Sequence, residues 1–404
     1  MKIGLALSGG GYRAAVFHLG VLARLAESGA FAQVSVLSTV SGGSLCAGML
    51  FGLNGMRFPT PAEYLETVLP QAERILTTQD LQKDLAARVL GSFWTLFGTR
   101  ADDLSALIRQ KWGITQPLNA LPDKPHWLIN ATCYETGKNW RFEKRRMGDY
   151  KFGYTHDTDI PLSDAMAASA GFPGGIGALQ LKTEGRRWYQ YAERAPTLAD
   201  DQERAFTVQD IPPPYPAVHL WDGGAYDNHG LEGVHDFEKG WQLGIDFLIV
   251  SDAAGRSKPE KYQPGPKAIM RLMTGIMMDQ IRSLRSRAII ERFVNHHDRG
   301  VFLQTGNTHE KVIRAARRGK GLPAALIDHE VAQVSAGSLS AEEAALVAEM
   351  PTVIRRLTQA EFTRLLRHGF EVADVTLYAY YPDEFPLIGF TQSQAFLRRR
   401  ATAS

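Results

Sequence analysis

Residues 36–46 read VLSTVSGGSLC, and this short stretch decides how the rest of the chain is interpreted. A run of β-forming residues ends at Ser41, and two glycines follow at once, where the backbone must turn sharply. One interpretation is an ordinary turn from a strand into a helix. The other is a nucleophile elbow, a tight strand–turn–helix bend that holds a serine hydroxyl out toward a substrate.

The residues on either side of Ser41 test the elbow interpretation. Strand and helix crowd together at an elbow, so the positions two before and two after the serine must be small. Gly43 meets this requirement, whereas Thr39 occupies the upstream position where glycine is usual. Ser44 also has small neighbours at both positions, but it would lie inside the first helical turn. The pattern therefore favours Ser41 over Ser44 as the exposed serine.

The sequence around this turn predicts an α/β fold. Apolar runs at 2–8 and 34–40 are typical of buried strands, and each is followed by a glycine-rich turn. Helical spacing of apolar residues follows each turn, at 14–29 and 43–53. Strand, turn and helix repeated in this order indicate a parallel sheet, whose ligands lie at the strand ends.

The remaining chain extends this prediction. We expect a central, mostly parallel sheet sandwiched by helices, in a single domain that spans residues 1–404. Helical patterns alone occupy about 55–125 and are interpreted as an insertion. The polar, proline-rich stretch 183–217 is interpreted as surface loops, and about 266–404 is expected to be mainly helical.

The C-terminal part contains two helix start signals and one strand-like run. Ser340 with Glu343, and Thr358 with Glu361, have the spacing of capping boxes. The run VTLYAYYP at 375–382 is rich in β-branched and aromatic residues, so it is predicted to be a last strand.

Composition limits the classes of function. The chain has 45 basic and 43 acidic residues, a balance that gives no case for a dedicated nucleic-acid binder. Its two cysteines, Cys46 and Cys133, are too few for a disulfide framework, and no Cys/His set has zinc spacing, so we expect a reducing cytoplasm and no metal. The start, MKIGLALSGGG, lacks the features of a signal peptide, and no apolar run reaches spanning length. Contact with a membrane would therefore be peripheral.

The glycine run SGGGYRAA at 8–15 has two possible interpretations. Its Gly9-x-Gly11-x-x-Ala14 spacing fits the loose dinucleotide-binding pattern, but that site also needs an acid at the end of the second strand. The second strand ends in Thr39-Val40-Ser41, without an acid. What remains is a set of backbone N–H groups at a helix N-terminus, a site that favours negative charge such as an oxyanion.

Two aspartates are candidates for a catalytic base. Asp222, in WDGGAYDNHG at 221–230, ends an apolar run, and the two glycines after it leave its carboxylate uncovered. An ordinary Asp-Gly turn is the alternative interpretation. Asp252, in LIVSDAAG, also follows a strand, but it fits equally well as the cap of a following helix.

Taken in order, the motifs SGGGYRA, TVSGGS and DGGAYDN resemble those of the patatin-like phospholipases, which share their catalytic fold with the cytosolic phospholipases A. The segments NATCYETGK and AMAASAGFP also look like family features, so the resemblance covers about 1–50 and 127–255. It implies a Ser–Asp dyad and a glycine-loop oxyanion hole. By position, it implies Ser41 as nucleophile, Asp222 as dyad acid, and Gly9, Gly10, Gly11, Arg13 and Gly42 as oxyanion or substrate-binding residues.

This resemblance implies a serine lipid acyl hydrolase of the phospholipase A or lysophospholipase type, acting on fatty-acyl esters of glycerophospholipids at a membrane surface. The chemistry requires neither a metal nor a cofactor. A carboxylate with limited solvation can accept the serine proton and return it to the leaving alkoxide. The glycine-loop amides would stabilise the tetrahedral oxyanion.

Two other functions stay open on the sequence. A carboxylesterase or thioesterase would use a Ser–Asp–His triad, and Ser41, Asp222 or Asp252, and His296 or His297 follow the chain order of such enzymes. A solvated helix end is the alternative interpretation of the two histidines. A catalytically silent lipid-binding or regulatory protein would keep the fold but lose efficient turnover through Thr39.

Three segments are candidates for membrane contact. GSFWTLFG at 91–98 concentrates aromatic residues that suit an interface or a core. The stretch 268–298 places methionines on one face with arginines nearby, as in a lid, an interfacial helix or a core helix. RAARRGK at 314–320 would meet anionic head groups or form a solvated loop.

Overall fold

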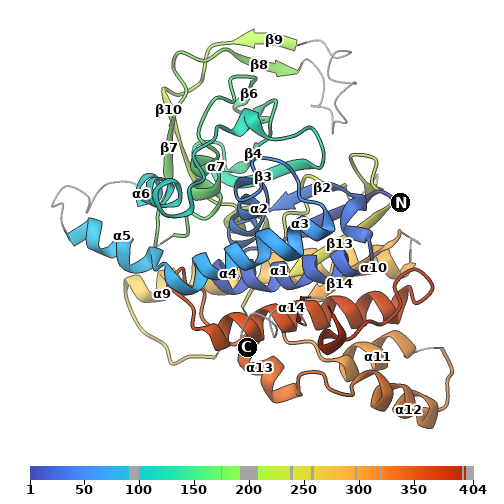
Figure 1. Ribbon diagram of the computed structural model, residues 1–404. Helices are drawn as coiled ribbons and strands as arrows, with labels where there is room; N and C mark the ends of the chain where they lie inside the picture. The colour runs from blue at the N-terminus through green and yellow to red at the C-terminus, as the bar shows by residue number, and fades with distance from the viewer. Residues whose placement is uncertain are drawn as a thin grey trace.

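The chain begins with two strand–helix units, as the sequence predicts. They are β1 (Ile3–Leu7), α1 (Gly11–Glu27), β2 (Val34–Thr39) and α2 (Gly42–Gly52), with η1 (Ala30–Gln33) between them. The computed structural model describes residues 1–90, 100–173, 175–191, 208–236, 240–255, 259–295, 298–318, 320–393 and 395–396. Figure 1 shows the elements of these parts of the chain.

Five parallel strands form the centre of the main sheet, which confirms the predicted α/β architecture. Their order is β14 (Gly300–Gln304), β13 (Phe247–Asp252), β1, β2 and β3 (His126–Cys133). Leu7 lies opposite both Thr39 and Ser251 in the register. The carboxyl ends of β1, β2 and β13 are therefore level, and the turns that follow these strands lie side by side.

Beyond β3 the sheet continues with antiparallel strands, which form the upper lobe in Figure 1. These strands are β4 (Lys138–Phe142), β5 (Met147–Asp149), β6 (Gly153–Thr155), β8 (Trp188–Tyr191) and β9 (Val208–Ile211). The prediction of loops over 183–217 is wrong at β8 and β9. Trp188 and Tyr189 are buried in the lobe, and this local burial outweighs the polar composition around them.

One edge of β3 is shared by two strands that run toward each other. β2 pairs with the first half of β3 in parallel, ending at Thr39 opposite Ile129. β10 (Ala217–Asp222) pairs with the second half in antiparallel orientation, ending at Asp222 opposite Ala131, and its other edge pairs with β7 (Leu179–Lys182). The carboxyl ends of β2 and β10 therefore meet on either side of Asn130.

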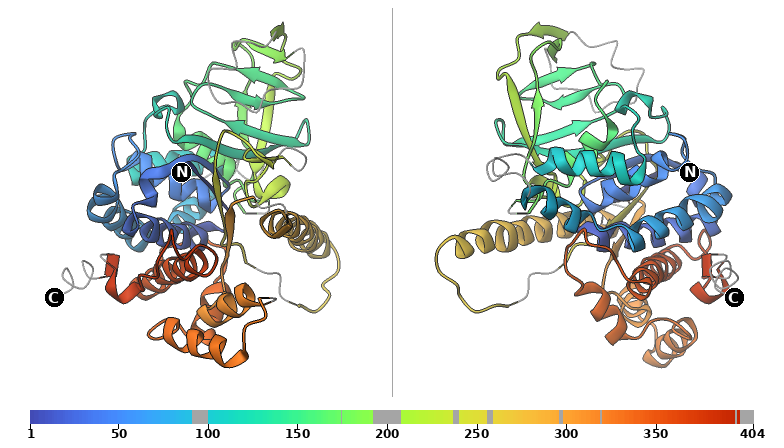
Figure 2. Two further views of the ribbon diagram at one scale, coloured as in Figure 1. Left: turned by 90° about the vertical axis from the view of Figure 1, so that its right-hand side faces the viewer. Right: turned by 60° about the vertical axis from the view of Figure 1, so that its left-hand side comes forward.

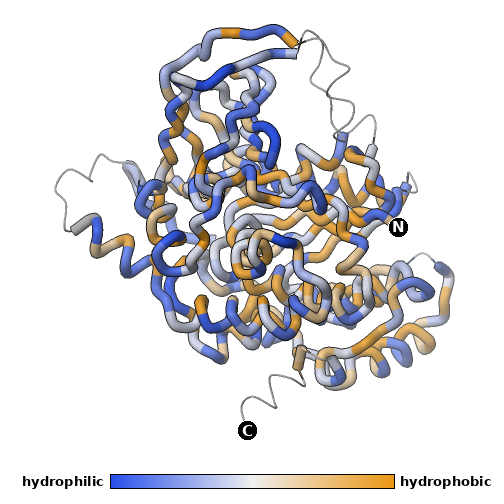
Figure 3. The backbone as a smooth tube through the Cα atoms, turned by 45° about the horizontal axis from the view of Figure 1, so that its top comes forward, coloured by the Kyte–Doolittle hydropathy of each residue, from blue (hydrophilic) through white to orange (hydrophobic). Residues whose placement is uncertain are grey.

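Helices cover both faces of the parallel strands. Leu5 and Ile249 belong to the large core with α1, α2 and α14 (Gln359–Tyr380), whereas Ala6 and Val250 pack in a second core that includes Ile289 of α10 (Met278–Asn295). Alternate residues of a strand point to opposite faces, which produces this division. Figure 2 (left) shows α10 on one side of the sheet and α1 and α14 on the other. In Figure 3 the hydrophobic stretches are concentrated in the centre of the molecule.

The other helices lie mainly before β3 and after β13. Described residues between 53 and 125 contain helices and turns but no strand: α3 (Pro61–Glu63), η2 (Tyr64–Val68), α4 (Leu69–Thr78), α5 (Leu81–Leu90), α6 (Arg100–Leu107), η4 (Ile108–Trp112) and η5 (Leu118–Ala120). The remaining elements are α7 (Leu162–Ser169), α8 (Gly224–Asp227), β11 (His235–Asp236), β12 (Gly240–Trp241), α9 (Pro266–Met270), η7 (Arg271–Met277), α11 (His309–Arg317), α12 (Ala324–Val334), α13 (Ala341–Ala348) and η8 (Phe390–Gln392). Within the described ranges, no helix combines the length and apolar character needed to cross a membrane.

The C-terminal part corrects one prediction. Its described residues are mainly helical, and they also contribute β14, an edge strand of the parallel sheet. The predicted strand at 375–382 is wrong, because residues up to Tyr380 continue α14. This helix begins at the predicted capping box of Thr358 and Glu361, and the box of Ser340 and Glu343 likewise begins α13. The β-branched and aromatic residues favour a strand only weakly, and packing of the helix against α1 overrides that preference.

Helices α1 and α14 pack at very short range, which requires two glycines. A Cβ atom at Gly20 would collide with the carbonyl oxygen of Leu366, and one at Gly369 would collide with that of Phe17. A buried ion pair joins Arg24 of α1 to Asp374 of α14, with both side chains at most 1% exposed. Because α1 begins at the glycine loop, this contact fixes the helix that carries the loop.

We expect Gly369→Ala to lower the free energy of unfolding by about 1–3 kcal/mol, because the added methyl group forces two backbones apart. Chemical denaturation followed by circular dichroism measures the change. Arg364→Ala is the matched control, since Arg364 lies on the exposed side of the same helix and should change stability little. Equal stability of wild type and Gly369→Ala would contradict the close packing.

Candidate active site

Ser41 lies at a strained turn between β2 and α2. Its backbone has φ 51° and ψ −115°, a conformation that residues with a side chain rarely adopt. A Cβ at Gly42 would collide with the carbonyl oxygen of Gly11, and one at Gly43 with that of Leu7. The two glycines after Ser41 therefore allow α2 to start directly against β1 and the glycine loop, as an elbow requires.

A chain of buried hydroxyl groups holds this turn in place. The Ser41 N–H donates to Ser169 Oγ at 3.0 Å, and the Ser169 hydroxyl donates to the carbonyl oxygen of Asn130 at 2.7 Å. Ser44 Oγ lies 2.8 Å from Ser169 Oγ and 2.8 Å from Thr39 Oγ1. Trp127 Nε1–H donates to Thr39 Oγ1 at 2.9 Å.

The donor and the acceptor in each of these hydrogen bonds follow from the groups at the two ends of the network, the Trp127 indole and the Asn130 carbonyl. An indole N–H can only donate and a carbonyl can only accept. Ser169 uses its one hydrogen for the Asn130 carbonyl, so Ser44 donates to Ser169 and Thr39 donates to Ser44. Every hydroxyl is thereby satisfied in a buried site, where an unpaired group would cost about 1–3 kcal/mol.

This arrangement explains how the elbow accommodates Thr39 where glycine is usual. The threonine hydroxyl accepts from Trp127 and donates to Ser44, so the larger side chain is part of the hydrogen-bond network. Ser44, the competing serine, is fully buried and bonded on both sides. Ser44 therefore supports the turn, while Ser41 lines a cavity.

The glycine loop lies directly beside Ser41. A Cβ at Gly9 would stand 3.0 Å from Ser41 Cβ, and Gly10 and Gly11 adopt positive φ angles of 142° and 61°. The Gly9 N–H donates to the Asn228 carbonyl at 3.2 Å and the Tyr12 N–H to the Val353 carbonyl at 2.9 Å.

Two amides of the loop lack a backbone partner. Within the described ranges, no backbone hydrogen bond is formed by the N–H groups of Gly10 and Gly11. These amides stand at the N-terminus of α1, where backbone N–H groups favour negative charge. The loop therefore offers two donors without a backbone partner in the cavity that Ser41 also lines.

Asp222 reaches the same place from β10. Its carboxylate accepts from the Gly224 N–H at 2.7 Å, and the Ser41 hydroxyl is close enough to lower its pKa through a side-chain hydrogen bond. Burial outweighs both effects and raises the pKa of Asp222 to about 6. A Cβ at Gly223 would stand 2.5 Å from the Asn130 carbonyl oxygen, so the glycine allows β10 to end tightly against β3.

Arg13 is placed beside the loop, with its donors directed at backbone and hydroxyl acceptors. Its Nε donates to the Ala253 carbonyl at 3.1 Å, Nη1 to the Met350 carbonyl and Nη2 to Thr352 Oγ1 at 3.1 Å. Burial lowers the pKa of Arg13 to about 10, so it stays charged at neutral pH. Arg13 thus ties the segment before α14 to the glycine loop.

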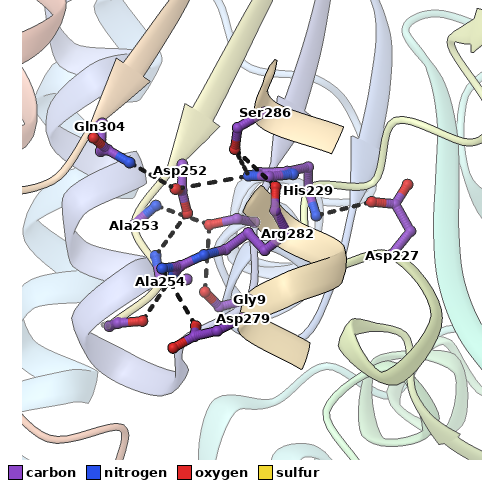
Figure 4. Close-up of polar contacts among 12 residues, drawn as sticks. Gly9, Asp227, His229, Asp252, Ala253, Ala254, Asp279, Arg282, Ser286 and Gln304 are labelled. Carbon is purple, nitrogen blue, oxygen red and sulfur yellow. Dashed lines mark hydrogen bonds and ion pairs between the residues drawn. The ribbon is translucent and has the colours of Figure 1, made fainter. Parts of the chain in front are cut away.

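Asp252 occupies a different environment from Asp222, and Figure 4 shows the polar groups around Asp252. Its carboxylate lies 3.6 Å from His229 Nε2 and accepts from the Ala254 N–H at 3.1 Å and from Gln304 at 3.4 Å. Burial raises the pKa of Asp252, but His229, Arg282 and the Ala254 amide outweigh it and hold the pKa below its usual range. Asp252 does not line the cavity that contains Ser41.

A second buried histidine, His18 of α1, contacts the residue just before the glycine loop. His18 Nε2 lies 2.9 Å from the Ser8 carbonyl oxygen and Nδ1 lies 2.9 Å from Ser251 Oγ. A carbonyl only accepts, so Nε2 carries the proton and Nδ1 accepts from the Ser251 hydroxyl. Burial lowers the pKa of His18 to about 4, with the Ser8 hydrogen bond and Asp252 acting in the other direction, so the ring is neutral at pH 7.

The cavity above Ser41 has a volume of about 1120 Å³. Ser41, Asp222, Gly9, Gly10, Gly11 and Arg13 all line it. Its apolar walls come from segments far apart in the sequence: Leu45, Leu85, Phe172, Ile176, Met278, Met350 and Ile354. No histidine is among its lining residues in the described part of the chain.

The other predicted sites lie partly outside the described residues. His296 and His297 lie outside the described residues, and so does GSFWTLFG at 91–98. In the basic cluster at 314–320, Arg314 pairs with Glu310 and Asp328, and Arg317 pairs with Glu330. Over the residues that the structure describes, no group of three or more His, Cys, Asp or Glu side chains could hold a metal ion.

Three supporting residues escaped the sequence analysis. Ser169 and Asn130 fix the elbow, and Asn228 lines the cavity while its carbonyl accepts from Gly9. Each lies in a segment that the resemblance had marked, AMAASAGFP, NATCYETGK and DGGAYDN respectively. The segments were recognised as patterns, but their hydrogen bonds depend on contacts between distant parts of the chain.

Comparison with known proteins identifies the family of the chain. The family model described as "Patatin-like phospholipase" matches residues 5–235, which include the glycine loop, Ser41 and Asp222. Among curated proteins, none matches the chain.

Solved structures provide a further comparison at the level of the fold. Human GIVD cytosolic phospholipase A2 is similar with a TM-score of 0.51 and 13% identity, over 95% of this chain and 62% of that one. The chain thus spans less than two thirds of that structure. VipD from Legionella pneumophila has a TM-score of 0.35 and 12% identity, over 100% of this chain and 74% of that one.

We expect Ser169→Ala to slow covalent labelling of Ser41 by a fluorophosphonate probe and to lower the unfolding free energy by about 1–3 kcal/mol, because the Ser41 amide and the Ser44 hydroxyl lose their acceptor. Ser163→Ala is the matched control. Ser163 is also a buried serine of α7, bonded to Ser105 and Arg109 rather than to the elbow. It should lose comparable stability and keep the wild-type labelling rate. Equal labelling of both variants would contradict a positioning role for Ser169.

Proposed function

Because this chain belongs to the patatin-like phospholipase family, we propose that it is a serine lipid acyl hydrolase of the phospholipase A or lysophospholipase type. Its substrates are fatty-acyl esters of glycerophospholipids. One observation carries the proposal: Ser41 stands at a strained turn, beside a buried aspartate of raised pKa and two unused amides, in one large cavity. We place its action at a membrane surface in a reducing cytoplasm, in keeping with two free, buried cysteines.

In the first proposed step, Ser41 Oγ attacks the ester carbonyl carbon while Asp222 accepts the hydroxyl proton. A serine hydroxyl is a poor nucleophile without such a base. With a pKa near 6, Asp222 is ionised at neutral pH and is more basic than an exposed carboxylate. Burial among glycines and β3 is the cause of this shift.

In the tetrahedral intermediate, the former carbonyl oxygen carries the negative charge. The amides of Gly10 and Gly11 are the donors that we assign to this oxygen, with Gly42 at the start of α2 beside them. Loss of one such donor typically costs about a hundredfold or more in rate. The protonated Asp222 then gives its proton to the leaving alkoxide as the bond between carbon and that oxygen breaks. The product is an acyl ester of Ser41 and a free alcohol.

Water completes the cycle. Asp222, again ionised, accepts a proton from a water molecule that attacks the acyl-Ser41 carbonyl, and it returns that proton to Ser41 Oγ. The amides of the glycine loop hold the second oxyanion as they held the first. A free fatty acid leaves, and Ser41 and Asp222 regain their starting protonation states.

The cavity supports a long-chain substrate. Its volume of about 1120 Å³ exceeds that of a typical small-molecule site, and its apolar walls extend well beyond Ser41.

We also propose that residues 1–404 form one domain. In support, the segment around Met350 lines the cavity while α14 packs on α1, so the C-terminal part contributes directly to the site.

The two rival functions have less support. A Ser–Asp–His triad needs a histidine within reach of the serine, but in the described residues no histidine lines the cavity that contains Ser41, and neither does Asp252, which His229 contacts. A catalytically silent protein would follow from a distorted elbow at Thr39. That threonine is instead hydrogen-bonded on both sides, and the strained φ of Ser41 is retained.

We expect Ser41→Ala to abolish fluorophosphonate labelling and ester hydrolysis, and Asp222→Asn to reduce turnover by several orders of magnitude. The asparagine keeps the shape of the side chain but cannot accept the proton. Hydrolysis of phospholipid in mixed micelles, with a circular dichroism spectrum of each variant, measures both effects. Asp252→Asn serves as the comparison carboxylate and should retain measurable turnover if it folds. Full activity of Asp222→Asn would overturn the dyad.

The rate should also depend on pH through Asp222. Since the base must be ionised, kcat/KM should fall as pH drops below about 6, by about tenfold for each further unit. An exposed aspartate would shift this fall to lower pH. A pH–rate profile on a soluble short-chain ester, collected with a stability control at each pH, measures this fall in kcat/KM. A constant rate down to pH values well below 6 would contradict Asp222 as the base.

A further inference from the structure

The helical segment that begins at Pro266 stands away from the body of the protein. It consists of α9, η7 and α10 in continuous succession, and Figure 2 (right) shows its first turns projecting beyond the sheet and the other helices. Neither α9 nor η7 contains a buried residue. A core role for the methionine stripe, one interpretation of its sequence, is therefore wrong over these turns.

The projecting turns expose an apolar patch. Six side chains within nine residues are 42–61% exposed, and they form what we call the apolar patch: Ile269, Met270, Leu272, Met273, Ile276 and Met277. Single exposed apolar residues are normal on a soluble protein. A continuous group of this kind marks a surface that binds a protein, a ligand or a membrane when the protein functions.

The same segment takes part in the cavity. Thr274 lies within the sequence of the patch, and Met278 follows it directly. Both residues line the cavity that contains Ser41. Asp279 and Arg282, one turn further on, line it as well. One side of this helical stretch therefore forms a wall of the site while the other carries the patch. The stretch also contains a π-helix, a feature that occurs often at functional sites.

The base of the segment is fixed to the body, as Figure 4 shows for Arg282 and Ser286. Arg282 donates to the Gly255 carbonyl at 2.7 Å, and Arg285 pairs with Glu232 at 3.1 Å. Ile289 is buried in the core on that face of the sheet. These contacts hold the patch in a defined position next to the cavity.

The chemistry of the patch favours a lipid surface as its binding partner. None of its six side chains has a hydrogen-bond donor or a strong acceptor, whereas protein interfaces combine apolar contact with many hydrogen bonds. Residues 266–278 contain no acid, and their charged residues are Lys267, which is exposed, and Arg271, which pairs with Glu260. Lys267 thus adds an exposed positive charge beside the apolar side chains, a combination that suits a helix in a phospholipid interface.

We propose that the apolar patch is the surface by which this protein docks on phospholipid membranes, with the patch immersed among the lipids and the cavity opening beside it. The proposal rests on the proposed function, because it names the physical source of the substrate for the same site. An acyl chain that leaves the membrane at the patch would reach Ser41 along Met278 and Thr274. The chain would thus avoid exposure to water on its way.

The test uses the full chain with Ser41→Ala, so that binding is measured without turnover. Vesicles of an equimolar mixture of phosphatidylcholine and phosphatidylglycerol are sedimented with this protein and with a form that also carries Met273→Gln and Met277→Gln. Glutamine matches methionine in size and helix propensity but not in hydrophobicity. We expect the two changes to weaken vesicle binding by about tenfold or more.

The matched control carries Leu326→Gln and Leu346→Gln, two leucines of α12 and α13 that are 58% and 60% exposed. It should bind vesicles like the parent protein, and the thermal unfolding midpoint of each form shows that it is folded. Equal binding by all three forms overturns the proposal. So does a dimer in sedimentation velocity that the methionine changes dissociate while vesicle binding is unaffected, because a second copy would then cover the patch. Hydrolysis by the wild type tests the proposed function separately, since vesicle binding does not require turnover.

Discussion

Two strands that run toward each other along one edge of β3 create the candidate site. β2 ends at Thr39 and β10 ends at Asp222, and Asn130 of β3 lies between the two ends. Asn130 donates to the Thr39 carbonyl, and its own carbonyl accepts from Ser169, which in turn binds the Ser41 amide. A serine and an aspartate far apart in sequence are thus held together by hydrogen bonds to a single strand. The strained backbone of Ser41 persists because this network over-determines it.

The glycine loop depends on a different set of contacts. It lies at the start of α1, and α1 is fixed by its close packing on α14 and by the buried pair of Arg24 and Asp374. Arg13 then ties the segment at Met350 to the loop. The C-terminal part of the chain therefore determines the position of groups that lie near its N-terminus, although no motif in that part indicates the role.

The two buried aspartates show how environment separates residues of one type. Asp222 has the Gly224 amide and the Ser41 hydroxyl as partners, and burial raises its pKa. Asp252 is equally buried, but its interactions with His229, Arg282 and the Ala254 amide keep its pKa low. A base must be ionised and still able to accept a proton, which describes Asp222 better than Asp252. Asp252 fits a structural role behind the glycine loop.

The parallel start of the sheet, the glycine loop and the turn at Ser41 could be predicted from sequence, because they depend on local periodicity and on glycines at fixed spacing. The capping boxes at Ser340 and Thr358 were readable for the same reason. The helical identity of 375–380 was not, because its residues favour a strand locally and only packing on α1 reverses the preference. The sequence also does not reveal that β10 is antiparallel to β3 or that the Thr39 hydroxyl belongs to a buried hydrogen-bond network. It likewise does not show that the apolar patch at 269–277 is exposed. Each depends on which distant segments come into contact, and only the tertiary structure decides that.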